Sequence, residues 1–464
     1  MKPLEFAQKA SLDAISPIDG RYREHLDPLS SLFSERALIE SRCRVELSWA
    51  LALEKTGIFP PLTQSERDRI SKLRECFGEP EAVAVKEIEA RTRHDVKALE
   101  LFLRERLALV NPNRIHFGLT SEDVNNLAYS LVLKEFVKSH QIPALKRLLA
   151  HLCQCAGEWA DAPFPTRTHG QPATPSTAGK ELSVFVARLA RLWKKLRNFR
   201  FSGKCNGAVG NYSAMHAAFP GFDWPRFARD FVADLDLEHN PITTQIEDHD
   251  VWAEYFNLTR QVNNVVLDLD QDMWNYLLLG FFMEEARSGE VGSSTMPHKV
   301  NPIRFENSEG NLLLSNSLLA FLSDKLCRSR MQRDLSDSTV SRNMGVALAH
   351  SYLGLTETLT GLERVRLNAT RCLAELRQSP FLLAEPVQTI LRTVRCDDPY
   401  SLLKELTRGK PFDEERLGSF VEGLDVVPEI RERLARLKVE EYVGEAPRLC
   451  RETVETTLLD LERL

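Results

Sequence analysis

The sequence has few residues that break helices, with 22 glycines and 23 prolines among 464 positions. A protein built from many short strands needs more turn-forming residues than this. No apolar run approaches the roughly 20 residues that a membrane-spanning helix requires. The first residues also lack the apolar stretch typical of a signal peptide. We therefore expect a helical protein that stays in the cytoplasm and has no membrane partner.

An excess of one charge sign is also missing, since the net charge at pH 7 is only −6. Apolar residues make up 43% and charged residues 27%, which is the balance of a folded globular protein. The slight acidity argues against a dedicated nucleic-acid-binding protein, because such proteins usually present a basic domain. The stretch 188–204 is basic and contains no acid. A nucleic-acid or membrane surface is one interpretation of it, but its apolar stripe favours the charged outer face of a helix.

Signatures of zinc, phosphate and dinucleotide binding are absent. Of the nine cysteines, only Cys153 and Cys155 lie close together, and this spacing alone is no zinc pattern. Reduced thiols, as in a cytosolic protein, are the plain interpretation. The sequence contains no GxxxxGK[ST], GxGxxG or HExxH motif. The dipeptides His94-Asp95 and His249-Asp250 leave one alternative open, a metal-dependent phosphohydrolase.

Long helical periodicity dominates the middle of the chain. Apolar residues recur at helical spacing from Leu182 to Leu196 and again from Leu258 to Leu277. Asp268, Asp270 and Asp272 fall within the second stripe, so we interpret them as helix positions and not as a calcium loop. Thr174-Pro175 is interpreted as a helix start, with a capping residue followed by proline.

These patterns predict an all-α fold with a central bundle of long helices. Further helices are expected at about 121–150, 306–327 and 343–365. Prolines interrupt the chain within 162–177 and after residue 366, which predicts an ordered loop and a last region of shorter helices. The expected domains are 1–117, 118–365 and 366–464.

The segment 288–302, SGEVGSSTMPHKVNP, carries the densest set of reactive side chains. Two hydroxyls, an imidazole, an ammonium and an amide fall within nine residues, at Ser293, Ser294, His298, Lys299 and Asn301. Two preceding glycines favour a loop that closes on a ligand and excludes water. A solvated polar loop is the alternative.

Three other segments suit acid–base chemistry or anion binding. His169 lies in a proline-rich turn, and histidine titrates near neutrality. The segment 120–123, TSED, opens a helix, whose first N–H groups suit an anion. Arg333 and Arg342 flank a run of hydroxyls and suit a phosphate or carboxylate, since guanidinium binds these groups bidentately. The alternatives are a histidine bonded to loop backbone, a plain helix cap and a surface ion-pair network.

Together these segments resemble one family. The stretch 292–302 is similar to the signature loop of the fumarase/aspartase superfamily, GSSxMPxKxNP. Within it, His298 before Lys299 and THGQPATPST at 168–177 resemble the adenylosuccinate lyase family, whereas argininosuccinate lyases typically carry Gln before that Lys and a THLQ turn. Further segments that resemble its bacterial branch are SPIDGRY (16–22), TRHD (92–95), TSED (120–123), GAVGNY (207–212), TTQIEDHD (243–250) and QRDLSDSTVSRN (332–343).

The resemblance implies a three-domain fold whose long central helices tetramerise into a multi-helix core. The implied homotetramer has active sites shared between subunits. The implied reaction is β-elimination of fumarate from adenylosuccinate to give AMP. The same family splits succinyl-aminoimidazole-carboxamide ribotide earlier in purine synthesis. No cofactor, metal or nucleic-acid partner is implied.

The resemblance also implies roles for single residues. Ser293 is the base and His169 the acid, although the sequence leaves open whether Ser293 or Ser294 loses its proton. Arg93 stands where some members have Asn, so its contact with substrate stays open. The implied substrate-binding residues are Arg21, Tyr22, Arg93, His94, Asp95, Thr120, Ser121, Gln245, Ser294, Lys299, Val300, Asn301, Asn307, Arg333, Ser338, Thr339, Val340, Ser341 and Arg342.

Two further alternatives remain within the superfamily. One is another fumarate-releasing lyase, chiefly argininosuccinate lyase. The other is a non-catalytic structural protein that keeps the fold, against which the presence of Ser293, Lys299 and His169 argues.

Overall fold

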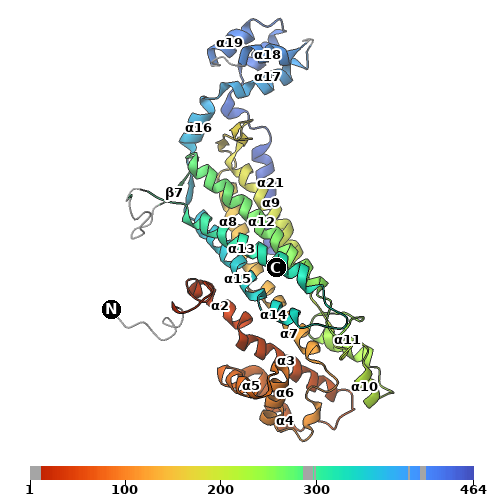
Figure 1. Cartoon of the computed structure of the whole chain (residues 1–464). Coiled ribbons are helices and arrows are strands. Elements are labelled where there is room, and N and C mark those ends of the chain that lie inside the picture. Colours follow the sequence, from red (N-terminus) through yellow and green to blue (C-terminus); the bar gives the residue numbers. More distant parts are fainter. Residues whose placement is uncertain (1–11, 286–295, 297–298, 395–397, 408–413, 464) are drawn as a thin grey trace. The chain divides into compact units, whose positions relative to one another are not determined.

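The structure is a computed structural model that describes residues 12–285, 296, 299–394, 398–407 and 414–463. Helices dominate these residues, and the strands there form four two-stranded sheets (Figure 1). The predicted all-α class is therefore confirmed. No helix among the described residues has the length and apolarity to cross a membrane.

The longer helices alternate with short connecting segments. Among the described residues, the α-helices of the N-terminal half are α2 (Arg23–Phe33), α3 (Glu35–Glu54), α4 (Gln64–Cys76), α5 (Glu79–Thr92), α6 (Asp95–Leu107), α7 (Ser121–Phe136), α8 (Ile142–Glu158), α9 (Ala178–Arg197), α10 (Ser213–Ala218) and α11 (Trp224–Asp234). The others are α12 (Asp250–Leu278), α13 (Ile303–Leu326), α14 (Ser336–Ser341), α15 (Met344–Leu362), α16 (Ala369–Arg377), α17 (Ala384–Leu391), α18 (Pro399–Thr407), α19 (Glu414–Glu422), α20 (Pro428–Ala435) and α21 (Ala446–Glu462).

The strands are only two or three residues long. They pair as β1 (Pro163–Phe164) with β4 (Ser176–Thr177), β2 (Arg167–Thr168) with β3 (Gln171–Pro172), β5 (Ser202–Gly203) with β6 (Glu238–His239), and β7 (Phe282–Glu284) with β8 (Val365–Leu367). Among the strands of the described residues, only β5 and β6 run parallel.

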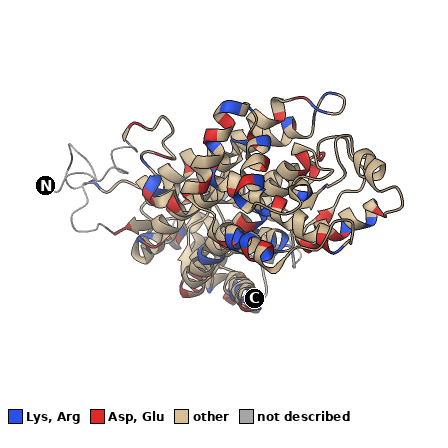
Figure 2. Ribbon diagram, turned by 90° about the horizontal axis from the view of Figure 1, so that it is seen from below, with Lys and Arg blue, Asp and Glu red and all other residues tan. Residues whose placement is uncertain are grey.

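Most helices expected from periodicity are present. The segment expected at 121–150 consists of α7, a π-turn at Val137–Gln141 and α8. Asp268, Asp270 and Asp272 lie within α12, as predicted. The basic stretch lies mostly in α9, where Arg188 pairs with Asp268. Charges of both signs are interspersed over the ribbon (Figure 2).

The predicted helix start at Thr174-Pro175 is wrong. Thr177 pairs with Pro163 across the β1–β4 ladder, so the chain is still extended at residues 176 and 177. The helix begins at Ala178, and the backbone N–H of Lys180 donates to Thr177 Oγ1 at 3.2 Å. Pairing with a distant segment therefore outweighs the local capping signal.

The chain forms two compact units, each assembled from separate stretches of sequence. The first unit comprises 1–144, 192–264 and 310–354, and the second comprises 145–191, 265–309 and 355–464. The division at residues 117 and 365 stays a prediction.

The first unit has an apolar core beneath α3, α4, α5 and α6. Leu47, Ile70, Val85 and Leu103 are at most 1% exposed there. The helix α3 also packs against α7, where Ser41 Oγ donates to the carbonyl of Ala128 at 3.0 Å. This packing holds α7 against α3.

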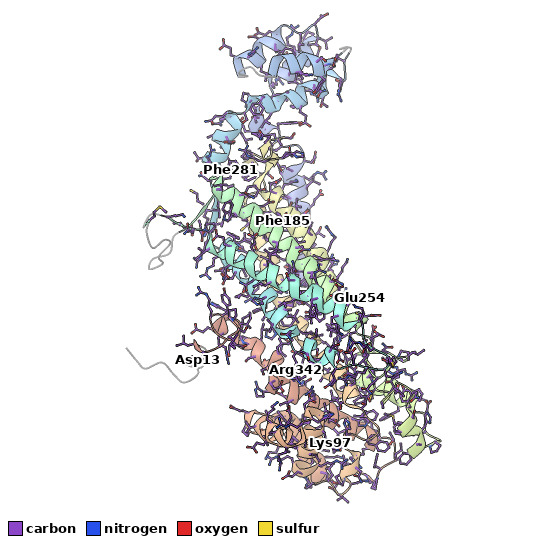
Figure 3. All side chains as sticks on the ribbon, in the orientation of Figure 1. Asp13, Lys97, Phe185, Glu254, Phe281 and Arg342 are labelled. Atoms are coloured by element: carbon purple, nitrogen blue, oxygen red, sulfur yellow. The ribbon has the colours of Figure 1, made fainter. Side chains whose placement is uncertain are left out.

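The second unit contains a helical cluster, α16 to α20, around residues such as Leu376, Val387 and Leu391. Elsewhere in the unit, aromatic rings pack edge to face, with Phe164 and Phe281 centroids 5.5 Å apart. Phe281 and Phe185, both labelled in Figure 3, are buried side chains of this unit.

Buried polar contacts join the long helices within each unit. In the first, Asn263 of α12 donates to Ser315 of α13 at 3.1 Å and accepts from Ser351 of α15 at 2.7 Å. In the second, Thr358 of α15 donates to Asp270 of α12 at 2.8 Å. Such bonds fix the register of neighbouring helices, because a shifted register would leave buried polar groups unpaired.

Candidate active site

A fully buried ion pair holds the beginning of α7. Lys204 Nζ lies 3.0 Å from Asp123 Oδ1, and both side chains are 0% exposed. The second carboxylate oxygen of Asp123 accepts the backbone N–H of Thr120, the capping residue of α7, at 2.8 Å. The predicted helix start at 120–123 is therefore confirmed. The pair fixes the backbone of Thr120 and Ser121, whose hydroxyls and helix-terminal N–H groups suit an anion.

The same carboxylate gathers two further segments of the predicted site. Asp123 Oδ1 accepts the backbone N–H of Asn206 at 3.0 Å, and the amide of Asn206 donates to Thr243 Oγ1 at 2.9 Å. Gln245 Nε2 donates to the carbonyl of Ala208 at 2.9 Å. The segments 120–123, 207–212 and 243–250, chosen from sequence alone, thus lie together.

Arg333 lies between two buried carboxylates. Its Nη2 is 3.3 Å from Glu122 Oε2, and its Nε is 3.5 Å from Asp337 Oδ2. His249 Nε2 lies 3.8 Å from Glu122 Oε1, and its ring stacks on Trp252 with centroids 4.1 Å apart. Burial raises the pKa of Glu122, although His249 and Arg333 act in the opposite direction.

A small cavity of about 10 Å³, lined mostly by polar side chains, adjoins these groups. Ser338 and Ser341 contribute to its lining from α14. The Ser341 hydroxyl donates to the carbonyl of Ser338 at 3.3 Å. Thr339 and Val340 lie on the same short helix but do not line this cavity. The structure thus brings Arg333, Ser338 and Ser341 together.

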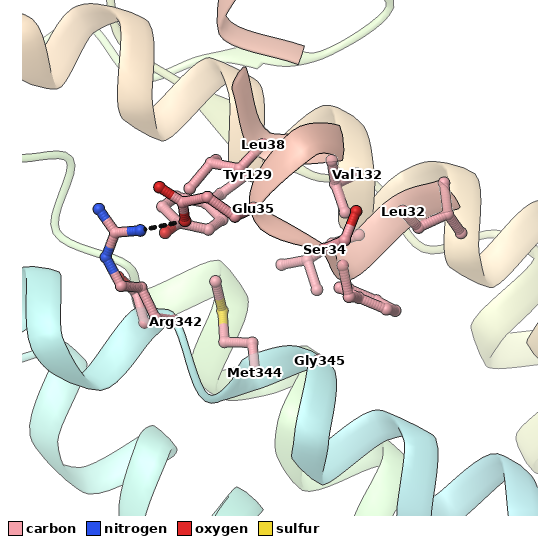
Figure 4. A pocket seen from close by; sticks show the side chains of 12 residues that line it. Leu32, Ser34, Glu35, Leu38, Tyr129, Val132, Arg342, Met344 and Gly345 are labelled. Carbon is pink, nitrogen blue, oxygen red and sulfur yellow. Dashed lines mark hydrogen bonds and ion pairs between the residues drawn. The ribbon is translucent and has the colours of Figure 1, made fainter. Parts of the chain in front are cut away.

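Arg342 follows α14 and contacts two carboxylates. Its Nη1 lies 2.6 Å from Glu35 Oε2, and its Nη2 lies 3.1 Å from Asp95 Oδ2. Arg42 Nη1 also binds Asp95 Oδ2, at 2.9 Å. Burial opposes ionisation of Asp95, but the two arginines and the N–H of Val96 hold its pKa below its usual range. Figure 4 shows Glu35 and Arg342 facing each other beside a pocket.

The remaining predicted residues of the first unit lie near helix ends. Arg21 and Tyr22 directly precede α2. Arg93 ends α5 in the left-handed region, with φ of 59°. His94 caps α6, where its Nδ1 accepts the backbone N–H of Lys97 at 3.1 Å. His94 is exposed, and its neighbour Asp95 forms the ion pair with Arg342 described above.

In the second unit, His169 occupies the tip of a tight hairpin. The strands β2 and β3 pair Thr168 with Gln171, so His169 and Gly170 are the two turn residues. Their φ values of 53° and 74° suit a turn with two left-handed residues. Arg167 at the hairpin base binds Glu375 at 2.5 Å. The imidazole is therefore exposed on a short, well-anchored turn.

The signature loop is described only in part. Ser293, Ser294 and His298 lie outside the described residues. Lys299 and Val300 are exposed, and Asn301 lies just before α13. Asn307 lies in the second turn of α13 and is half-buried.

Sequence reasoning missed three residues that hold the predicted ones in place. Lys204 counted only as the end of a basic stretch, and Glu35 was not singled out. His249 appeared in a dipeptide and within the segment 243–250, but it was given no role. No local pattern identifies them, because each acts through a partner far away in sequence. Among the described residues, no three or more His, Cys, Asp or Glu side chains form a group able to hold a metal ion.

Comparison with known proteins gives two family matches and close relatives. A lyase family model matches residues 20–314, and a model described as adenylosuccinate lyase C-terminal matches 329–443. The adenylosuccinate lyase of Haemophilus influenzae is 43% identical over 450 residues, covering 95% of this chain and 99% of its own. The adenylosuccinate lyase of Escherichia coli K12 is 43% identical over 445 residues, covering 94% and 98%.

Solved structures confirm the fold. The 3-carboxy-cis,cis-muconate lactonizing enzyme of Pseudomonas putida has a TM-score of 0.75 at 21% identity, covering 93% of this chain and 97% of its own. A fumarate lyase from Mesorhizobium sp. BNC1 has a TM-score of 0.77 at 18% identity, covering 92% and 97%. These likenesses concern the fold alone, whereas the sequence relatives also confirm the resemblance found in the motifs. The chain belongs to the adenylosuccinate lyase family.

Proposed function

We propose that this protein is a fumarate-releasing C–N lyase that cleaves adenylosuccinate to AMP and fumarate. It also releases fumarate from succinyl-aminoimidazole-carboxamide ribotide to give the carboxamide ribotide. The observation that carries the proposal is the 43% identity to the Haemophilus influenzae adenylosuccinate lyase along 95% of the chain. Both reactions belong to purine nucleotide biosynthesis.

The elimination needs a base and an acid with opposite tasks. Ser293 takes a proton from the succinyl carbon beside a carboxylate. The electron pair of that C–H bond becomes the double bond of fumarate, and the C–N bond breaks. His169 gives a proton to the departing nitrogen. An exposed imidazole at the tip of an anchored hairpin suits this task, because it reaches a ligand without losing its orientation.

Anion-binding groups hold the two ends of the substrate. Negative charge builds up on the succinyl carboxylate during proton removal, so N–H and cationic donors there stabilise the transition state. Thr120 and Ser121, fixed by Asp123, suit this position. The other succinyl-binding residues are Ser294, Lys299 and Asn301, and Val300 is a further substrate-binding residue of the same loop.

The nucleotide end is bound by the cationic residues of the first unit and their neighbours. The phosphate and ribose bind Arg21, Tyr22, Arg333, Ser338 and Arg342, and Thr339, Val340 and Ser341 are further substrate-binding residues on the same segment. His94, Asp95, Gln245 and Asn307 complete the site, and the contact of Arg93 with substrate stays open. Arg333, Ser338 and Ser341 line one small cavity, which supports assigning them to the same end of the substrate. The chemistry requires no cofactor or metal ion from these residues.

We further propose a cytoplasmic homotetramer whose active sites take residues from several subunits. Exposed apolar side chains on α12 and α13, such as Leu278, Leu314 and Phe321, support association through the long helices. The three domains 1–117, 118–365 and 366–464 are part of this proposal.

A substrate panel tests the proposed activity. Fumarate release is measured by ultraviolet absorbance, with adenylosuccinate, succinyl-aminoimidazole-carboxamide ribotide and argininosuccinate supplied separately. We expect turnover of the first two and none of the third. Turnover of argininosuccinate alone would contradict the proposal, and a folded protein inactive on all three would indicate a structural homologue. We also expect fumarate release to be unaffected by excess chelator, whereas a metal-dependent phosphohydrolase would lose its activity.

A further inference from the structure

Glu35 and Arg342 form a close ion pair that water still reaches. The 2.6 Å contact joins Glu35 Oε2 to Arg342 Nη1, and the side chains are 42% and 36% exposed. Exposed pairs of this kind contribute little net stability, because solvent screens them and two long side chains lose freedom. A stronger anion can therefore replace the carboxylate on Arg342 at small cost.

Glu35 has a second cation in contact on its other oxygen. Lys86 Nζ of α5 lies 3.3 Å from Glu35 Oε1 and 2.8 Å from Glu89 Oε2. If Arg342 moves to another anion, Glu35 remains neutralised by Lys86. The carboxylate is thus shared between a cation that belongs to the proposed site and one that does not.

The pair also lies where a ligand has room. Glu35 and Arg342 line both the small pocket of about 50 Å³ in Figure 4 and a neighbouring cavity of about 380 Å³, which is the one with room for a ligand. Ile18 and Asp19, from the segment 16–22 that precedes α2, line the larger cavity. This segment contains Arg21 and Tyr22, which the proposed function assigns to phosphate and ribose.

We propose that Glu35 is an internal competitor for the substrate phosphate at Arg342. In the ligand-free protein, the Glu35 carboxylate forms an ion pair with the Arg342 guanidinium. A phosphate displaces it, because a doubly charged, bidentate acceptor binds guanidinium more strongly than a carboxylate does. Glu35 then stays with Lys86. This inference rests on the proposed function, which places the nucleotide phosphate on Arg342.

The proposal fixes the sign of a mutational effect. Removing a competitor strengthens ligand binding, whereas removing a residue that orients Arg342 weakens it. Glu35→Gln should therefore lower the Kd for AMP about two- to fivefold, the range expected for an exposed ion pair. Lys86→Met should raise that Kd by a similar factor, because Glu35 loses its alternative partner. In the double variant, the effect of Lys86→Met should largely disappear.

Calorimetric titration of the full-length protein with AMP measures these changes, and adenosine serves as the ligand without phosphate. Asp234→Asn is the matched control, since it removes the same charge from another exposed pair, Lys55–Asp234. We expect Asp234→Asn to leave the Kd for AMP unchanged, and Glu35→Gln to leave the Kd for adenosine unchanged. Urea unfolding midpoints of all variants confirm that each one folds.

Three results would overturn the proposal. A higher Kd for AMP in Glu35→Gln would make Glu35 an orienting or ribose-binding residue. An unchanged Kd would show that the pair does not oppose phosphate binding. An equal gain in affinity for AMP in Asp234→Asn would show that the effect of Glu35→Gln comes only from the change in net charge. Failure of the proposed function is separate, because it appears as absent fumarate release by the wild-type protein, whereas the AMP titration needs no turnover.

Discussion

Asp123 and Lys204 form an ion pair without solvent exposure, 3.0 Å apart, and the carboxylate also holds the backbone N–H of Thr120. Two charges in the interior are tolerated when each is paired and hydrogen-bonded. Lys204 Nζ meets this condition, since it also donates to the carbonyl of Gly207 at 3.1 Å. The pair therefore contributes both to the stability of the fold and to the position of the N-terminal end of α7, which is the proposed anion-binding end.

Lys204→Met should destabilise the protein by about 3–5 kcal/mol, because it leaves the Asp123 carboxylate buried and unpaired. Urea unfolding measures this loss. Asp27→Asn is the control, since Asp27 pairs with Arg23 at the surface and its removal should cost less than about 0.5 kcal/mol. Equal effects of the two substitutions would show that the buried pair is not special.

Asp270→Asn should increase stability more at pH 8 than at pH 5. Burial raises the pKa of Asp270 well above its usual range, which disfavours the ionised carboxylate in the folded protein. A raised pKa contributes stability below the unfolded value, near 3.9, and that contribution is lost as the pH rises toward the folded value. Asparagine does not titrate, and its amide oxygen still accepts from Thr358.

Thermal unfolding of wild type and Asp270→Asn at both pH values checks this prediction. The exposed Asp324→Asn serves as the control on the neighbouring helix and should change stability by less than about 0.5 kcal/mol at either pH. A difference between wild type and Asp270→Asn that does not grow with pH would count against a raised pKa of Asp270.

Ser293→Ala should lower kcat by about 10²–10⁴-fold or more while leaving substrate affinity largely intact, since only the transition state uses the base. Steady-state fumarate release gives kcat, and calorimetry with adenylosuccinate gives the affinity. Ser294→Ala is the matched variant of the neighbouring hydroxyl. If Ser294→Ala loses the chemical step and Ser293→Ala retains it, the two serines exchange roles.

His169→Asn should also lower kcat by about 10²–10⁴-fold, because the departing nitrogen loses its proton donor. Asparagine tolerates the left-handed backbone at this position, so the hairpin is expected to persist. The pH profile of kcat separates a chemical role from a structural one. An unchanged rate and an unchanged profile would remove His169 from the mechanism.

Local signals predicted much of the helical fold. The apolar stripe of α9 appears in the structure as buried residues from Leu182 to Leu196. The helix start at Thr120–Asp123 was predictable from the sequence, because the hydrogen bond from the Thr120 N–H to the Asp123 carboxylate spans only three residues. The false start at Thr174-Pro175 has a non-local cause, because strand pairing with Pro163 keeps the chain extended there.

Non-local contacts also explain why sequence reasoning missed some residues of the site. Glu35 and Arg342 are 307 positions apart in sequence, so their contact exists only after folding. Lys204 belongs to a basic stretch whose members up to Arg197 lie on α9, and nothing in its immediate neighbours marks it as buried. Motif resemblance identified residues proposed to touch the ligand, whereas the residues that support them required the structure.

The most direct test of the account is a crystal structure of the Ser293→Ala protein with adenylosuccinate bound. The account predicts a ring nitrogen of His169 within about 3.2 Å of the departing nitrogen, the reach of a proton donor. It also predicts that the methyl group of residue 293 faces the succinyl carbon that loses its hydrogen. A closed loop over bound substrate with His169 more than about 6 Å from that nitrogen, too far for transfer even through one water, would contradict the account.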